Sequence, residues 1–182
     1  MRFTKTLLTT ALFGASIFSF QSTAWAIEQS QMTQVAQLYK QKDFKAMLAI
    51  LQPLAEQGDA IAQSLLGSVY EEGQGVKQDY FEAVKWYRKA AEQGYADAQV
   101  YLGLMYNLGK GVKENFYQAC VWFQKAAEQE QPIGQQMLGS CYLYGNMWQK
   151  DRIQAKKWYG LACDNGNQKG CEAYGELNRG ER

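Results

Sequence analysis

From Ala62 to Lys169 the chain repeats one pattern three times, with 36 residues between equivalent positions. A period of this length is typical of solenoids, in which each repeat is one supersecondary unit that cannot bury its apolar face without a neighbour. The pattern therefore constrains most of the chain to a stack of similar units. The recurring residues are Leu66, Leu102 and Leu138; Gly67, Gly103 and Gly139; Tyr70, Tyr106 and Tyr142; Gly73, Gly109 and Gly145; Ala83, Ala119 and Ala155; Trp86, Trp122 and Trp158; and Ala90, Ala126 and Ala162.

The apolar residues inside each repeat have helical spacing and fall into two groups separated by a loop that contains glycine. Asp79, Asn115 and Asp151 come just before the second group in the three copies. Side chains of this kind accept hydrogen bonds from the free amides of a first helical turn. Each repeat is therefore predicted to be a pair of antiparallel helices, and the fold to be all-α.

Gly67, Gly103 and Gly139 lie in the middle of the predicted first helices. Glycine there costs about 1 kcal/mol relative to alanine, so a packing reason is needed. We expect the backbone at these glycines to pass close beneath the ring of a Trp or Tyr from the second helix.

The first 26 residues have the pattern of a secretory signal peptide. Arg2 and Lys5 give a basic start, an apolar stretch follows over residues 7–20, and small residues precede a cleavage site near Ala26. The alternative is an uncleaved membrane anchor, which needs about 20 apolar residues. The stretch is shorter and is broken by Thr, Gly and Ser, so we expect cleavage, export to a bacterial periplasm or the cell exterior, and no stable membrane insertion afterwards.

Removal of Arg2 and Lys5 from the 19 basic residues leaves 17, against 18 acidic ones, with no block of like charge. Nucleic acids and anionic lipid surfaces bind clustered cations. The charge distribution therefore argues against both as partners. The remaining 156 residues or so are enough for one domain with a continuous core.

Four cysteines in an exported chain are candidates for disulfide bonds. Cys163 and Cys171 lie on either side of a predicted turn between helices, and closing this short loop would stabilise the C-terminal end by about 2 to 3 kcal/mol. Cys120 and Cys141 lie almost symmetrically about the preceding turn, where facing positions on antiparallel helices would let them bond. The alternative for this second pair is that both are small core residues.

The sequence from Ala62 to Gly94 reads Ala-Gln-x-x-Leu-Gly-x-x-Tyr-x-x-Gly-x-Gly-Val-x-x-Asp-x-x-x-Ala-x-x-Trp-Tyr-x-Lys-Ala-Ala-Glu-Gln-Gly. This string resembles the Sel-one-like repeat (SLR), a relative of the tetratricopeptide repeat. It recurs from Ala98 and, less regularly, from Gly134. The resemblance implies a right-handed α-solenoid of stacked antiparallel helix pairs, with about nine helices.

The domain organisation follows from the repeat register. A helical hairpin of tetratricopeptide type is expected over residues 27–61, with a first helix from about Gln29 to Gln41 and a tight turn at Lys42 and Asp43. The three repeats are assigned to residues 62–97, 98–133 and 134–169, followed by a closing helix and tail over 170–182.

Residues suited to catalysis or metal binding are few. The chain has no histidine, which removes the usual general base at neutral pH and the commonest zinc ligand. No serine or threonine after residue 26 is followed three positions later by lysine, as the Ser-x-x-Lys pattern of penicillin-recognising enzymes requires. The glycine loops lack the lysine and hydroxyl of a phosphate-binding loop. We therefore assign no catalytic residue, no metal site and no cofactor.

Binding is expected where the repeats differ, because the shared positions are needed for the core. With Leu66 at the centre of the buried face, positions equivalent to 64, 68 and 71 should face outward, and in related superhelices the first helices line the concave surface. Val100, Leu104 and Leu108 form an apolar row there, which Leu143 and Tyr144 extend. The alternative is that superhelical curvature buries these residues. The candidate partner-binding residues are Ser68, Glu71, Val100, Leu104, Asn107, Leu108, Ser140, Leu143 and Tyr144.

The hypothesis that best fits these features is an exported, non-catalytic adaptor or regulator that binds a protein or peptide in its concave groove. Envelope assembly, inhibition of a periplasmic sensor and immunity against a toxin delivered to the periplasm fit equally well. A secreted factor that acts on host cells is a further alternative, and cell fractionation would separate it from a periplasmic resident. The oligomeric state stays open.

The contrasting hypothesis is a β-lactamase or other penicillin-binding hydrolase. Some cysteine-rich members of the repeat family carry a β-lactamase label, and the segment from Ala162 to Cys171 is similar to their disulfide-bearing repeat. We expect the pure protein not to hydrolyse nitrocefin, because no nucleophile and base were found in the sequence. Hydrolysis that is lost on mutation of one particular residue would contradict this expectation.

Overall fold

A computed structural model describes residues 30–145 and 149–180. The expected signal peptide and its cleavage site lie outside these residues. The described part is all-α, with nine helices and no strand, and it is an α-solenoid of consecutive helix pairs. None of its helices has the length and apolar character needed to cross a membrane. The chain divides after Ile50 into two compact parts.

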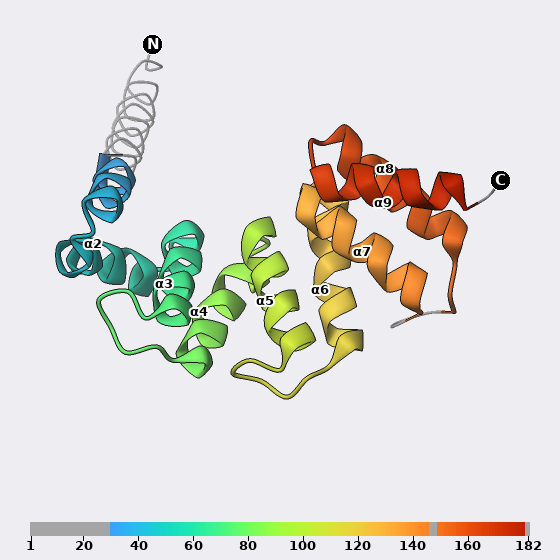
Figure 1. The fold of residues 1–182 in the computed structure, drawn as a ribbon. Coiled ribbons are helices and arrows are strands. Elements are labelled where there is room, and N and C mark those ends of the chain that lie inside the picture. Colours follow the sequence, from blue (N-terminus) through green and yellow to red (C-terminus); the bar gives the residue numbers. More distant parts are fainter. Residues whose placement is uncertain (1–29, 146–148, 181–182) are drawn as a thin grey trace, which may run out of the picture. The chain divides into compact units, whose positions relative to one another are not determined.

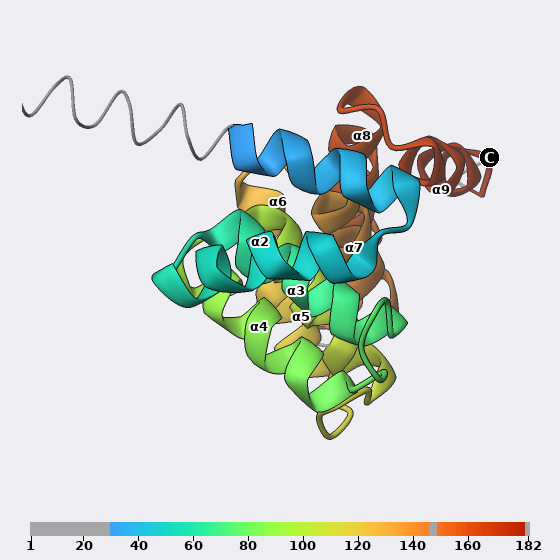
Figure 2. The same cartoon turned by 90° about the vertical axis from the view of Figure 1, so that its left-hand side faces the viewer.

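The N-terminal part begins with a helix over residues 30–41, which a tight turn joins to α2 (Phe44–Gln57), as Figure 2 shows. Lys42 adopts the left-handed conformation in this turn, with φ 59°. A side-chain oxygen of Asp43 accepts a hydrogen bond from the Ala46 amide at 3.1 Å, which caps α2. The expected first helix and the turn at Lys42 and Asp43 are therefore present.

Seven further helices follow α2 in the second part, and each packs against the next (Figure 1). In addition, α5 contacts α7 and α7 contacts α9, so the first helices of successive repeats also meet. The bounds are α3 (Ala60–Glu72), α4 (Tyr80–Glu92), α5 (Ala96–Leu108), α6 (Phe116–Glu128), α7 (Pro132–Tyr144), α8 (Arg152–Asp164) and α9 (Gln168–Arg179).

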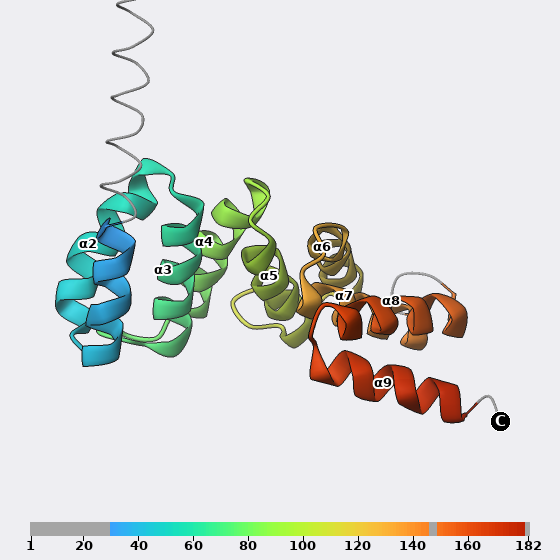
Figure 3. The same ribbon diagram turned by 90° about the horizontal axis from the view of Figure 1, so that it is seen from above.

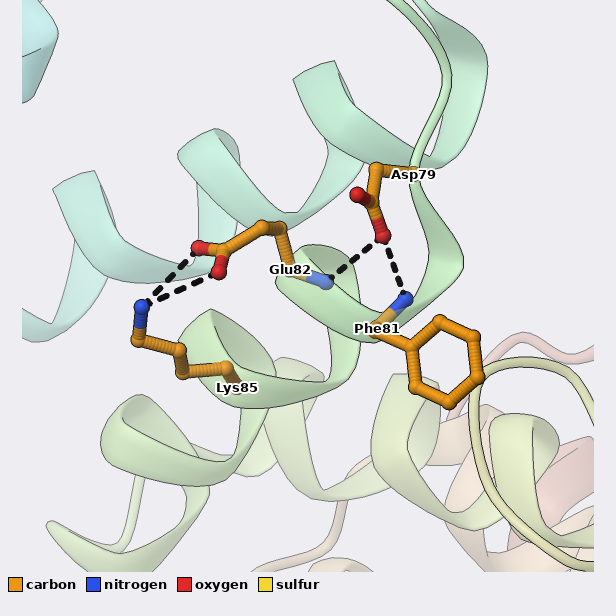
Figure 4. Close-up of polar contacts among 4 residues, drawn as sticks. All are labelled: Asp79, Phe81, Glu82 and Lys85. Carbon is orange, nitrogen blue, oxygen red and sulfur yellow. Dashed lines mark hydrogen bonds and ion pairs between the residues drawn. The ribbon is translucent and has the colours of Figure 1, made fainter.

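The second helix of each repeat begins at the residue predicted to cap it. Figure 4 shows Asp79, whose Oδ1 accepts hydrogen bonds from the amides of Phe81 and Glu82 at 2.9 and 3.1 Å. Asn115 and Asp151 cap α6 and α8 in the same way. These bonds satisfy amides that have no partner inside the helix, which is why Asp or Asn recurs at this position.

The mid-helix glycines lie beneath aromatic rings of the second helices. The ring is a tyrosine at Gly67 and Gly139, as expected, but at Gly103 it is a phenylalanine and not a Trp or Tyr. A Cβ atom on Gly103 would lie 2.5 Å from Cε1 of Phe123, and one on Gly67 or Gly139 would lie 2.6 or 2.7 Å from Cδ1 of Tyr87 or Tyr159. In each copy the ring belongs to the residue after the shared tryptophan. Glycine therefore sets the distance between the two helices of a repeat.

The tryptophans connect one repeat to the preceding one. Trp122 of α6 belongs to a core cluster formed mainly by α4 and α5, and Trp158 of α8 packs against the cluster of α6 and α7. Trp86 and Trp122 are buried, and Lys89 and Lys125 place their Nζ atoms 4.0 and 4.1 Å from the ring centroids. Their position in the core confirms that these indoles serve packing.

A buried glutamine at the same position of each repeat also links neighbouring units. Gln99 donates from Nε2 to the Ala91 carbonyl at 3.2 Å, and its Oε1 accepts from Gln129 at 2.8 Å. Gln63 makes the equivalent pair of bonds, and Gln135 accepts from Asn165 at 3.0 Å. Buried amides are stable only when they are hydrogen-bonded, so this position is fixed by the stack.

Both candidate disulfides are present. Cys163 and Cys171 join α8 to α9 with their Cα atoms 4.5 Å apart. Cys120 and Cys141 join α6 to α7 with a Cα separation of 6.0 Å, so the alternative of two unpaired core thiols is wrong. Each bond connects the second helix of one repeat to the first helix of the next unit.

Replacing Gly103 with Ala should destabilise the protein by about 1 to 3 kcal/mol, because the added methyl group overlaps the Phe123 ring. The measurement is urea unfolding followed by circular dichroism. Gly160→Ala is the matched control: its Cβ would meet Tyr174 at an ordinary 3.4 Å, so the gain in helix propensity should stabilise α8 by about 1 kcal/mol. Equal effects of the two changes would contradict the close-approach account.

Candidate functional site

The solvent-exposed face of each first helix is narrower than the face expected from the sequence. It is also rotated around the helix axis by about one residue position. In α5, Val100 is only 2% exposed, so its expected outward orientation is wrong, and Ser64 at the equivalent position of α3 is also buried. The reason is that α5 contacts α4, α6 and α7 together, which cover most of its circumference. The expectation from the sequence considered only the second helix of the same repeat as a packing neighbour of each first helix. For Val100, the alternative of burial by neighbouring units is therefore correct.

Leu104 and Leu143 are half-buried against core clusters. Leu104 packs on the cluster that contains Phe123, and Leu143 packs on the cluster that contains Tyr159. Part of the apolar row proposed from the sequence therefore belongs to the core of the repeats.

The difference among repeats at these positions has a packing explanation. The Tyr87 hydroxyl donates to a side-chain oxygen of Glu71 at 2.8 Å, and the Tyr159 hydroxyl lies 3.0 Å from Oγ of Ser140. The second repeat has Phe123 at this position, which has no hydroxyl, and Leu104 packs there instead. Polar partners are therefore present where the ring has a hydroxyl.

Ser68 and Asn107 are also half-buried, and Ser68 Oγ donates to Glu72 at 3.4 Å. Leu108 and Tyr144 are the two predicted residues that lie well exposed, at 54% and 64%. The structure thus separates the nine candidates into one buried residue, six half-buried ones and two exposed ones.

Sequence reasoning missed the apolar residues that lie on the true outward face. Tyr101 is exposed on one side and stacks on Tyr87, with ring centroids 5.1 Å apart. The spacing of Tyr101, Leu104 and Leu108 at i, i+3 and i+7 would have identified this face. Together the apolar side chains here define what we call the first-helix stripe: Ile61, Leu65, Tyr101, Leu104, Leu108, Ile133, Met137 and Tyr144.

Carboxylates lie beside this stripe. Burial raises the pKa of Tyr101, and the negative charges of Asp97, Glu71 and Glu72 raise it further. Tyr101 therefore lies within electrostatic reach of acidic side chains from both α3 and α5. The stripe combines an apolar surface with a negative border near α3 and α5.

No group of three or more His, Cys, Asp or Glu side chains in the described residues is arranged to hold a metal ion. The raised pKa values of the described residues belong to tyrosines of the helix pairs. Burial raises the pKa of Tyr95 to about 12, with Asp97 as the second cause. These tyrosines stay protonated at neutral pH, and the hydroxyls of Tyr87 and Tyr95 donate hydrogen bonds to Glu71 and Asp97.

Stacked helix pairs with a shared glycine, tyrosine and tryptophan register define a helical-repeat protein of the tetratricopeptide-like class. The family model of the Sel1 repeat matches residues 60–95, 96–130 and 132–167. The chain therefore belongs to the Sel1 repeat family, whose members are typically protein-interaction scaffolds and generally not enzymes.

Solved structures agree with this assignment. A Sel1 repeat protein from Oxalobacter formigenes is 34% identical, with a TM-score of 0.75 over 80% of this chain and 60% of that one. A protective antigen of uropathogenic Escherichia coli strains with an SLR fold is 36% identical, with a TM-score of 0.79 over 88% of this chain and 35% of that one. The chain thus spans less than two thirds of either relative.

Cysteine rich protein B of Helicobacter pylori is 24% identical, with a TM-score of 0.57 over 71% of this chain and 93% of that chain. At this identity the likeness extends to the fold alone. A comparison with curated proteins gave no match.

Replacing Tyr87 with Phe should lower the free energy of unfolding at neutral pH by about 1 to 2 kcal/mol, because it removes a hydrogen bond to a carboxylate. Burial and Glu71 raise the pKa of Tyr87, so the folded protein holds this proton more tightly than the unfolded chain does. The contribution of this bound proton to the free energy of unfolding is fully present below about pH 10 and is lost at higher pH.

The measurement is urea unfolding from neutral pH to about pH 11, because the linked loss of stability begins only above the pKa of about 10 of an unfolded tyrosine. Tyr87→Phe should show a smaller loss of stability with rising pH than the parent protein. Tyr117→Phe, at a half-exposed position on α6, is the control and should leave the profile unchanged. If the stability of Tyr87→Phe varied with pH as that of the parent protein does, the tyrosine proton at residue 87 would not be the one that couples stability to pH.

Proposed function

We propose that the protein is a non-catalytic scaffold that binds a partner protein or peptide along the first-helix stripe. The observation that carries this proposal is the apolar exposure of the stripe on successive first helices. Ile61, Leu65, Tyr101, Leu108, Ile133 and Tyr144 are each at least 40% exposed on α3, α5 and α7. Isolated exposed apolar residues need no explanation, but an array on one face of successive elements marks an interaction surface.

The chemistry of the stripe defines the partner. Tyr101 is held by stacking on Tyr87, so it offers an aromatic surface that loses little conformational entropy on binding. Leu108 and Tyr144 stand at the ends of α5 and α7, two first helices that contact each other. A partner segment with two or three apolar side chains and a cation facing Glu71, Glu72 or Asp97 would be complementary.

The disulfides and the N-terminal sequence pattern support a role outside the cytoplasm. Two disulfides are typical of proteins that mature in an oxidising environment, and the N-terminal pattern predicts export. We place the protein in the bacterial periplasm, where envelope assembly, sensor regulation and toxin immunity are equally compatible with the stripe. A secreted role in host interaction is the alternative, and the similar protective antigen of uropathogenic strains gives it some support.

Changing Leu108 and Tyr144 together to Gln should weaken partner capture at least about tenfold, or about 1.4 kcal/mol. Both side chains are exposed and Gln is a good helix former, so the melting temperature should stay unchanged. The measurement is affinity capture from envelope extract with the oxidised protein, followed by mass spectrometry of the bound proteins.

Phe81→Gln is the matched control, because Phe81 is 76% exposed on a second helix, away from the stripe. It should retain every protein that the parent captures. If Phe81→Gln lost the same captured protein as the Leu108 and Tyr144 variant, binding at the stripe would be contradicted. It would also be contradicted if both variants retained every captured protein.

A further inference from the structure

The first-helix stripe and the carboxylates beside it occupy three equivalent positions on α3, α5 and α7, which follow one another along the stack in Figure 3. Residues one period apart on these helices form rows that run across the stack. The three rows are Ile61, Asp97 and Ile133; Leu65, Tyr101 and Met137; and Glu72, Leu108 and Tyr144.

The third row changes its chemistry from one helix to the next. Glu72 at the end of α3 is an exposed carboxylate. Leu108 at the end of α5 is 54% exposed, and Tyr144 at the end of α7 is 64% exposed. A segment that crosses the three helices along this row therefore meets a negative charge first and two apolar side chains afterwards. The row thus has a direction.

The charges on the three helices follow the same order. Two carboxylates, Glu71 and Glu72, belong to α3, one, Asp97, belongs to α5, and α7 has none. None of these helices contains Lys or Arg, whereas α4, α6 and α8 all do. Burial raises the pKa of Tyr101, and the three negative charges raise it further, so carboxylates from two helices act on one exposed ring.

The three carboxylates are bonded to neutral groups only. Among the described residues, the donors to Glu71, Glu72 and Asp97 are the hydroxyl and amide groups of Tyr87, Ser68, Gln74, Tyr95 and Gln131. Neutral donors leave the negative charges uncompensated, and a cationic donor forms a hydrogen bond with a carboxylate that is roughly twice as strong. A Lys or Arg side chain that reaches this end of the stripe would therefore be attracted to it.

We propose that the stripe binds a cationic, amphipathic peptide segment of a partner protein in one direction. A Lys or Arg side chain of the segment lies against Glu71, Glu72 and Asp97. Its apolar side chains lie on Leu108 and Tyr144. The binding of this segment depends on the proposed function of the stripe, to which the row adds the charge and the direction of the occupant.

The packing of the helices sets the spacing of the segment. Because α5 contacts α7, their axes are about 8 to 10 Å apart. An extended chain rises about 3.3 Å per residue, so two side chains that reach both helices are at least about three residues apart. The cation lies on one side of both apolar residues, because the carboxylates belong to α3 and the first turn of α5.

The probe is a phage-displayed library of random peptides of about 12 residues, which reach about 40 Å when extended. It is selected on the immobilised, oxidised full chain. We expect the enriched peptides to carry Lys or Arg on one side of two apolar residues, in the same N-to-C order. The most enriched peptide is then synthesised with a fluorescent label, and its affinity is measured by anisotropy at low and high salt.

In the protein, Glu71→Gln, Glu72→Gln and Asp97→Asn are combined in one variant. Each new side chain keeps an oxygen that accepts hydrogen bonds, so the bonds from Tyr87 and Tyr95 remain possible and the fold should be retained. The variant should bind the peptide at least about tenfold more weakly than the parent, with most of the salt dependence lost.

The matched control combines Glu92→Gln, Glu128→Gln and Asp164→Asn. These carboxylates are exposed at one equivalent position of α4, α6 and α8, so the control changes the net charge by the same amount away from the stripe. It should bind the peptide like the parent. Equal weakening by the two triple variants would overturn the proposal, because the effect would then come from net charge alone.

Enriched peptides that lack Lys and Arg, or that are acidic, would also overturn the proposal. The proposed function would survive that result if the variant with Leu108 and Tyr144 both changed to Gln no longer bound them. A library that gives no enriched peptide, or peptides that bind this double variant as tightly as the parent, would contradict binding at the stripe itself. A dimer seen by analytical ultracentrifugation and lost in the double variant would overturn the proposal by assigning the stripe to a second copy.

Discussion

The fold depends on one contact, the passage of a mid-helix glycine of each first helix beneath an aromatic ring of its second helix. A single added carbon at Gly67, Gly103 or Gly139 would lie within about 2.7 Å of the ring, so no other residue fits without moving the pair apart. The tryptophan next to that ring then packs on the preceding unit. Close approach within the pair and indole packing between pairs thus generate the stack.

The same contact explains much of the variation among the repeats. Tyr87 and Tyr159 carry hydroxyls that bond to Glu71 and Ser140, whereas Phe123 is accompanied by Leu104. A residue that differs between repeats is therefore not by itself a sign of a binding site. Some of these differences are matched by a second difference in the same helix pair, which preserves the packing. Only those divergent residues that remain exposed, such as Leu108 and Tyr144, carry an argument about a partner.

Much of the architecture could be predicted from sequence because its causes are local. The caps Asp79, Asn115 and Asp151 act on the amides of the next turn, and the glycine register follows from a strict period. The disulfide partners could be paired because two antiparallel helices joined by a short turn bring symmetric positions together. Glu130 also keeps the left-handed conformation, with φ 60°, at the position where Gly94 and Gly166 stand. The turn geometry is thus imposed by the helices on either side of it.

The sequence by itself determined the period, the helix pairs, their caps and the residues that hold each pair together, since these depend on neighbours at fixed separations along the chain. The tertiary structure decided which side of each first helix faces outward. Contacts of α5 with three other helices bury Val100 and leave Tyr101 and Leu108 exposed. The exposure of a side chain depends on how many helices pack around its own helix. A repeat pattern that is the same in every unit does not specify how many neighbours each helix has.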